Sequence, residues 1–77
     1  MTAAPAISRP PVLGERIARF ILERETARPG GAHLFPRDLR DEACALARAG
    51  LLRRATAWDF YRVTEAGLLA AEEAAAG

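Results

Sequence analysis

Hydrophobic residues recur every three or four positions near the start of the chain, which places them on one face of a helix. The members of this stripe are Leu13, Ile17, Phe20 and Ile21. We expect the helix to begin at Pro11 or Val12, because proline is tolerated at the first helical position. It must end by Arg28, since the turn Pro29-Gly30-Gly31 breaks any regular element.

The segment after this turn predicts a short strand followed by a second long helix. Ala32 to Phe35 is the candidate strand, which would pair with a later hairpin as a third strand. Pro36 to Ala49 has the period of a helix. Its apolar face consists of Leu39, Ala43 and Leu46, and its opposite face of Arg37, Asp41, Cys44 and Arg48.

A hairpin and a last helix follow in close succession. Gly50 predicts the end of the second helix, because glycine adopts the left-handed conformation without a Cβ penalty. Leu51 to Arg54 then reads as a strand, and Phe60 to Val63 as its return. Thr64 is placed to cap a helix from Glu65 to about Ala75, with its hydroxyl accepting a backbone N–H of the first turn.

The stretch from Ala49 to Glu73 resembles the wing and following helix of winged-helix proteins, notably bacterial regulators of the MarR, PadR and ArsR types. Their pattern runs roughly L-x-x-x-G-L-[hydrophobic]-R, a variable tip, then Y-x-[LV]-T-x-x-G. The residues that fit it are Leu46, Gly50, Leu51, Leu52, Arg53, Tyr61, Val63, Thr64 and Gly67. The resemblance covers about a third of the chain and is more specific for fold than for function, because one fold hosts many functions.

The expected fold is therefore α+β, a small winged helix in the order helix, strand, helix, strand, strand, helix. Residues 1–10 form a flexible N-terminal arm in this interpretation, and residues 11–76 a single winged-helix domain. The family carries a further helix before its recognition helix. Only Thr26 to Phe35 is available for it here, so we expect that helix to be missing or reduced to a turn.

The chain of 77 residues has few bulky core candidates for a stable domain. They are Leu13, Ile17, Phe20, Ile21, Leu34, Phe35, Leu39, Leu46, Leu51, Leu52, Tyr61, Val63, Leu68 and Leu69. A homodimer would bury additional apolar surface. The sequence has no apolar run that could span a membrane, and its single cysteine, Cys44, excludes an internal disulfide, which is compatible with a cytoplasmic protein.

Charge and arginine positions define the candidate nucleic-acid-binding residues. The net charge is only +1, and all eleven basic residues are arginines, which suit protein interfaces as well as nucleic acid. The candidates are Arg37, Arg40 and Arg48 on the second helix and Arg53, Arg54 and Arg62 on the wing. On the helix, the carboxylates Asp38, Asp41 and Glu42 balance its arginines, which disfavours entry into a polyanionic groove. The wing arginines either contact phosphates beside the groove or protect a sheet edge from aggregation.

Two aromatic residues near the wing tip are the candidate partner-binding residues. Alternation along the return strand puts Tyr61 and Val63 on the helix side, and Phe60 on the far face with Trp58 near it. Large aromatic side chains on an open sheet face point to a partner. The alternatives are folding of the tip onto its own first helix, and stacking on a nucleobase.

No enzyme chemistry is expected. His33 has no second histidine and one remote cysteine, so no metal set assembles, and it reads as structural or solvent-exposed. Cys44 lacks the base and orienter that a catalytic thiol needs. No glycine-rich phosphate loop is present in the sequence, so no cofactor is expected.

Two functions remain. The resemblance implies a small DNA-binding transcriptional regulator that acts as a dimer and presents two second helices and two wings to duplex DNA. The alternative is a winged-helix inhibitor of phage or prophage type, similar to anti-CRISPR or anti-defence proteins. It would bind a protein or nucleoprotein complex through its wing and its neutral helix face.

Overall fold

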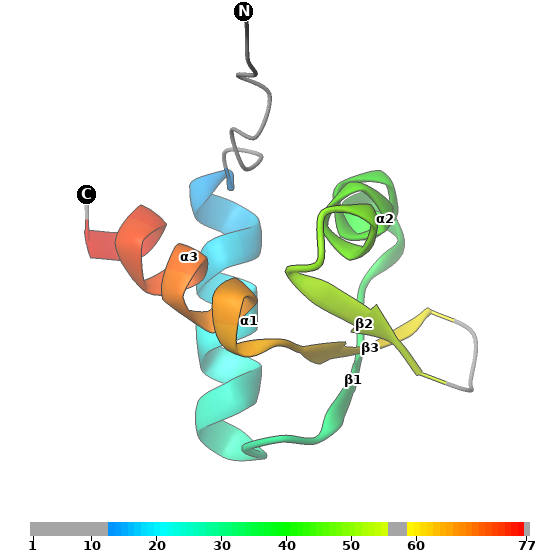
Figure 1. Ribbon diagram of the computed structural model, residues 1–77, viewed down its shortest axis with the longest axis horizontal. Helices are drawn as coiled ribbons and strands as arrows, with labels where there is room; N and C mark the ends of the chain where they lie inside the picture. The colour runs from blue at the N-terminus through cyan, green and yellow to red at the C-terminus, as the bar shows by residue number, and fades with distance from the viewer. Residues whose placement is uncertain (1–12, 56–58, 77) are drawn as a thin grey trace, which may run out of the picture.

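The computed structural model describes residues 13–55 and 59–76. These form a small α+β domain of three α-helices and a three-stranded antiparallel sheet (Figure 1). In chain order the elements are α1 (Glu15–Ala27), β1 (Ala32–Leu34), the 3₁₀ turn η2 (Arg37–Leu39), α2 (Arg40–Arg48), β2 (Leu52–Arg54), β3 (Phe60–Val63) and α3 (Glu65–Ala76).

Helix α1 begins at Glu15, so the expected start at Pro11 or Val12 was wrong. Gly14 is its N-cap with an extended backbone (φ −68°, ψ 156°), and glycine is a poor residue for a helix interior. Glu15 then opens the helix, where a carboxylate is favourable at the positive end of the helix dipole. Leu13 lies before the helix and is nevertheless buried.

The expected second helix from Pro36 to Ala49 is divided. Pro36 is extended (φ −65°, ψ 156°), and the first turn is a 3₁₀ turn because the Leu39 N–H donates to the carbonyl three residues earlier. The backbone angles of Leu39 (φ −106°, ψ 6°) are not those of an α-helix, and its side chain is buried in the core. The regular helix therefore comprises only Arg40–Arg48.

Helix α2 ends as the sequence predicted, at Gly50, whose φ is +84°. The Gly50 N–H donates to the Ala47 carbonyl, and the Leu51 N–H donates to the Leu46 carbonyl at 2.9 Å. These two bonds are the Schellman pattern that satisfies the last carbonyls of a helix. Leu46 and Leu51 are both buried, so the turn also delivers the chain into the core.

The sheet has the strand order β1-β3-β2, and each neighbouring pair is antiparallel. The prediction that the strand near Ala32 pairs with the hairpin is confirmed. Tyr61 of β3 lies between His33 of β1 and Arg54 of β2, while Arg62 lies opposite Arg53. Because successive side chains alternate between faces, Tyr61 and Arg54 share one face, and Arg62 and Arg53 share the other.

The core lies where the three helices meet the Tyr61 face of the sheet, and α3 crosses α1 and packs against it (Figure 1). The buried apolar residues are Leu13, Ile17, Ala18, Ile21, Phe35, Leu39, Ala43, Leu46, Leu51, Leu52, Tyr61 and Ala71. Val63 packs against them, as predicted. The prediction that Leu34 and Leu69 lie in the core was wrong, because Leu34 is 55% exposed and Leu69 is 60% exposed. Leu34 points to the opposite face of its strand from buried His33, and Leu69 lies on the outer face of α3, away from buried Ala71.

Candidate nucleic-acid interface

The acidic side chains of the η2–α2 segment are turned mainly toward α1. Asp38 forms an ion pair with Arg16 of α1. A carboxylate oxygen of Glu42 lies 3.4 Å from the position that a Cβ on Gly14, the N-cap of α1, would occupy. A carboxylate beside a helix N-terminus is favourable. Two of the three carboxylates that balance the helix arginines in the sequence are therefore directed away from its outer face.

A thiol, a phenol and a guanidinium meet at the side of α2 that lies next to the hairpin. The Sγ of Cys44 lies 3.5 Å from the hydroxyl of Tyr61, and an Nη of Arg54 lies 4.0 Å from the same sulfur. The hydrogen bond with Tyr61 is the largest cause that lowers the pKa of Cys44 below its ordinary value, and the positive charge of Arg54 acts in the same direction. The same hydrogen bond raises the pKa of Tyr61.

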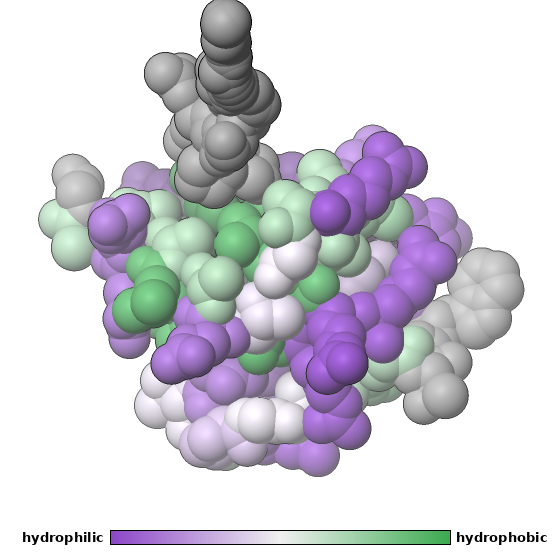
Figure 2. Space-filling model, viewed as in Figure 1, coloured by the Kyte–Doolittle hydropathy of each residue, from purple (hydrophilic) through white to green (hydrophobic). Residues whose placement is uncertain are grey.

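Arg48 lies close enough to this group to act on it electrostatically. Its charge also contributes to the lowered pKa of Cys44. Arg48 comes from the last turn of α2 and Arg54 from the end of β2, and both are exposed. The structure therefore brings together one candidate arginine of the helix and one of the wing. Figure 2 shows hydrophilic surface on this outer side of α2.

The other two helix arginines lie toward the start of the segment. Arg40 forms an ion pair with Asp59, in which Nε lies 3.4 Å from Oδ1. Arg37 is exposed and lines a groove with Asp59. Asp59 itself adopts a left-handed backbone (φ +60°), which aspartate tolerates better than most residues. One aspartate thus offsets part of the positive charge here, while the Arg48–Arg54 end has no such ion pair among the described residues.

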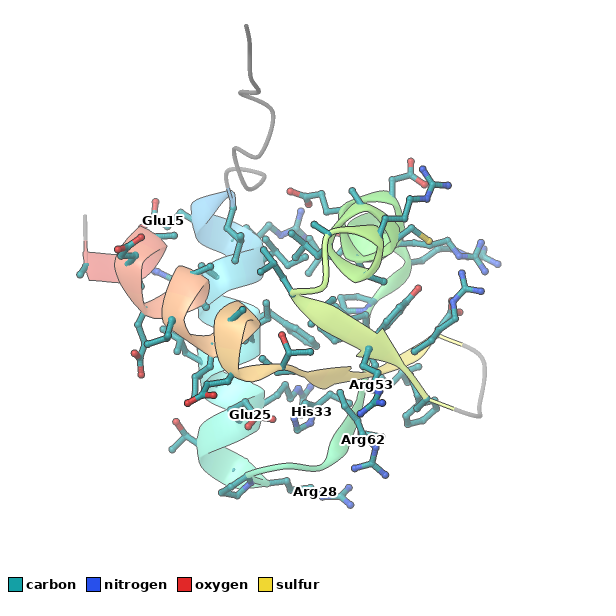
Figure 3. All side chains as sticks on the ribbon, viewed as in Figure 1. Glu15, Glu25, Arg28, His33, Arg53 and Arg62 are labelled. Carbon is teal, nitrogen blue, oxygen red and sulfur yellow. The ribbon has the colours of Figure 1, made fainter. Side chains whose placement is uncertain are left out.

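Arg53 and Arg62 lie on the other face of the sheet. They are direct cross-strand partners, and an Nη of Arg62 donates to the Gly30 carbonyl at 2.8 Å. Figure 3 shows both side chains on the side of the hairpin away from α2, with Arg28 beyond them. The structure therefore divides the three wing arginines between two faces, because neighbouring strand residues point in opposite directions.

The predicted aromatic pair is only partly described. Phe60 is half-buried and lies opposite Leu34 of β1, whereas Trp58 lies outside the described residues. Tyr61 belongs to the core as expected, and its ring packs edge-on against Phe35 at 5.4 Å between centroids.

His33 is a structural residue with a partner that the sequence analysis missed. Its Nε2 lies 2.6 Å from Oε1 of Glu25, and the two side chains are 3% and 12% exposed. The other oxygen of Glu25 accepts the Gly30 N–H at 3.2 Å. Glu25 therefore ties α1, the glycine turn and β1 together. The only signal in the sequence was a carboxylate and an imidazole on either side of a turn, which is a common arrangement.

Two features are absent from the part of the chain that the structure describes, a metal-binding group of side chains and a membrane-spanning helix. No three side chains of His, Cys, Asp or Glu there are grouped to hold a metal ion. No helix in that part is long and apolar enough to cross a membrane.

Comparison of the chain with protein-family models, with curated proteins and with solved structures gives no match in any of the three. Two exposed guanidinium groups on adjacent elements can each bind a phosphate bidentately.

Proposed function

We propose that this protein is a small DNA-binding domain of the winged-helix type, which contacts duplex DNA through the outer face of α2 and through Arg54 of the hairpin. The observation that carries the proposal is the separation of charge. Asp38 and Glu42 are directed toward α1, while Arg54 approaches Cys44 of α2 and exposed Arg48 lies one turn further along the same helix.

The order of elements supports the winged-helix assignment. The hairpin of β2 and β3 follows α2 directly and is itself followed by α3. Between α1 and η2 the structure has only the strand β1 and no further helix, as expected for the segment from Thr26 to Phe35. A helix of nine residues such as α2 is about 14 Å long, and the major groove, about 12 Å wide, admits an α-helix.

The outer face of α2 is better suited to phosphate than to base recognition. Apart from arginine it offers Asp41, Cys44 and Ala45, and these lack the amide groups that read adenine. Phosphate contacts give affinity and register but little sequence information. Specificity would then come from a cytoplasmic homodimer whose two copies contact adjacent grooves. Exposed Leu69 on α3 is a candidate contact between the copies.

The test is binding of a fluorescein-labelled duplex of about 20 base pairs, measured by anisotropy over a range of salt concentrations. We expect affinity to fall steeply with salt, and the slope to decrease by about 1 for each of Arg48→Ala and Arg54→Ala. Arg19→Ala is the matched control, because Arg19 is exposed but paired with Glu15 on α1. Absence of binding at low salt, or an equal effect of the control, contradicts the proposal.

A second candidate function is protein binding by an inhibitory winged-helix protein of the anti-CRISPR kind. The observation that favours it is the apolar surface formed by Leu34 and Phe60, which the domain leaves partly exposed. This function predicts a stable complex with a protein or nucleoprotein target, weakened by Phe60→Ala or Trp58→Ala while the fold is retained. Unfolding of the Phe60→Ala variant would instead assign that ring to the core.

A further inference from the structure

We propose that the free edge of β1, with the groove beside it, binds an acidic peptide in an extended conformation as an additional strand. This surface is distinct from the Arg48–Arg54 face, and the inference does not depend on DNA binding. It follows from the backbone of β1, the charge of the groove and the apolar pair at its floor.

The backbone of β1 has unused hydrogen-bonding groups. β1 lies at the edge of the sheet and pairs only with β3. The Phe35 N–H donates to the Asp59 carbonyl at 3.0 Å, so the alternation of an antiparallel pair turns the N–H and C=O groups of Ala32 and Leu34 away from β3. None of the other hydrogen bonds among the described residues uses those four groups. Such an edge is a template for strand addition.

A groove follows this edge on the side of α1. It consists of two adjoining depressions of about 290 and 400 Å³, which share Arg24 and Leu34. Arg28 lies at one end of the groove and Arg37 at the other. The only acidic side chain among its described lining residues is that of Asp59, which is already paired with Arg40.

The floor of the groove is apolar. Leu34 is 55% exposed, and its direct cross-strand partner is half-buried Phe60. A third apolar side chain packed over such a cross-strand pair would add to its stabilising contacts. An added strand would place alternate side chains over this pair, and its carboxylates would be within reach of the flanking arginines.

Charge decides between the possible occupants. In a second copy of this chain added through the same edge, the arginine-lined groove would face another arginine-lined groove, and like charges across an interface are unfavourable. Nucleic acid cannot supply the alternating N–H and C=O groups that a strand edge requires. An acidic peptide with apolar residues at alternate positions satisfies the backbone, the arginines and the apolar floor together.

The experiment uses the full chain and a fluorescein-labelled seven-residue peptide that alternates aspartate with valine. A peptide that alternates lysine with valine tests the charge. Two N-methylated forms of the acidic peptide test the backbone, because each removes one alternate set of N–H groups. We expect the lysine peptide to bind at least about tenfold more weakly, and only one of the two methylated forms to lose a similar factor.

Variants and backbone amide shifts locate the site. Arg28→Glu should weaken binding of the acidic peptide about fivefold or more, whereas Arg19→Glu, on the part of α1 remote from β1, should not. Circular dichroism of both variants verifies that they fold. The amide resonances of Ala32 and Leu34 should shift on addition of the peptide.

Four results would overturn the proposal. The first is equal binding of the acidic and lysine peptides, and the second is equal binding of the acidic peptide and both of its methylated forms. The third is a set of amide shifts confined to α2 and Arg54. The fourth is a homodimer, detected by sedimentation, that Leu34→Asp dissociates. The third would assign acidic peptides to the DNA-binding face, and the fourth would assign the edge to a second copy.

Discussion

Thr64 shows how a single side chain joins two elements. Its hydroxyl accepts the Gly67 N–H at 3.0 Å, which is the predicted cap of α3. The same hydroxyl has one proton to donate, and two carbonyl acceptors lie within reach of it, that of Gly50 at 2.8 Å and that of Leu51 at 3.0 Å. The cap therefore also fixes the start of α3 against the end of α2. Threonine suits this position because one hydroxyl can both accept and donate.

At the same scale, Arg53 and Arg54 are neighbours in the chain with different surroundings. Arg54 approaches Cys44 on the α2 side of the sheet, and Arg53 lies opposite Arg62 on the other side. This difference makes Arg53 a matched control for any property that depends on Arg54.

The first prediction concerns the reactivity of Cys44. A lowered pKa means that the thiolate is present at lower pH than for an ordinary cysteine, so alkylation by iodoacetamide should begin at lower pH. Tyr61→Phe should shift the midpoint of the rate–pH profile upward, because it removes the largest cause of the lowered pKa. Arg54→Ala should also shift it upward, because Arg54 lowers the same pKa through a hydrogen bond and through its charge.

Arg53→Ala should leave this profile unchanged. If Tyr61→Phe and Arg54→Ala both keep the midpoint of the unmodified protein while the fold is retained, these two side chains do not lower the pKa of the Cys44 thiol.

At the scale of elements, α2 illustrates why net charge alone misleads. The η2–α2 segment is electrically balanced in sequence, yet Asp38 and Glu42 are directed toward α1 while Arg48 is exposed to solvent. A helix presents different residues to different neighbours, so the charge that a partner meets depends on the docked orientation.

The contact between α3 and the start of the hairpin is equally specific. A Cβ on Gly67 would lie 1.9 Å from the carbonyl oxygen of Leu51, and both groups belong to rigid backbone. The glycine of the T-x-x-G pattern is therefore explained by close approach of the helix, because only a residue without a side chain allows it.

The second prediction follows from this contact. Gly67→Ala should force α3 away from Leu51 and cost about 3 kcal/mol of unfolding free energy, a typical magnitude for overpacking. That is a large part of the stability of a domain of this size. Gly14→Ala is the control, since its Cβ would meet only the flexible end of Glu42 at 3.4 Å. Urea unfolding followed by circular dichroism measures both, and equal midpoints would contradict the predicted close contact.

At the scale of the whole molecule, small residues allow the two long helices to lie together. Ala18 of α1 and Ala71 of α3 are both 0% exposed, and α3 crosses α1 in contact with it (Figure 1). Alanine is useful here because it adds little bulk at the contact and favours the helix. The alanine-rich end of the sequence is thus in part a packing surface.

The third prediction tests this packing. Ala71→Leu should separate the helices and lower the unfolding free energy by about 1–3 kcal/mol. Ala75→Leu, at an exposed position of the same helix, should change stability by less than about 0.5 kcal/mol. Thermal unfolding compares the two variants. A Tm of Ala71→Leu at or above that of Ala75→Leu would show that the contact between α1 and α3 tolerates a larger side chain.

The sequence by itself determined the types and approximate positions of the elements in the described residues. The stripe that includes Ile17 and Ile21, the stop at Gly50 and the cap at Thr64 are local signals, because periodicity and backbone preference act between residues a few positions apart. The sequence placed the start of α1 and the first turn of α2 less well, since both depend on how Gly14 and Leu39 meet the core.

Only the tertiary structure decided which side chains meet. It joined His33 to Glu25, Arg54 to Cys44 and Gly67 to Leu51, and it left Leu34 and Leu69 exposed. These relations depend on the orientation of whole elements, which is set by packing over the entire core and is encoded at no single position. The wing arginines show the difference most directly, because one strand presents Arg53 and Arg54 to opposite faces and only one of those faces lies beside α2.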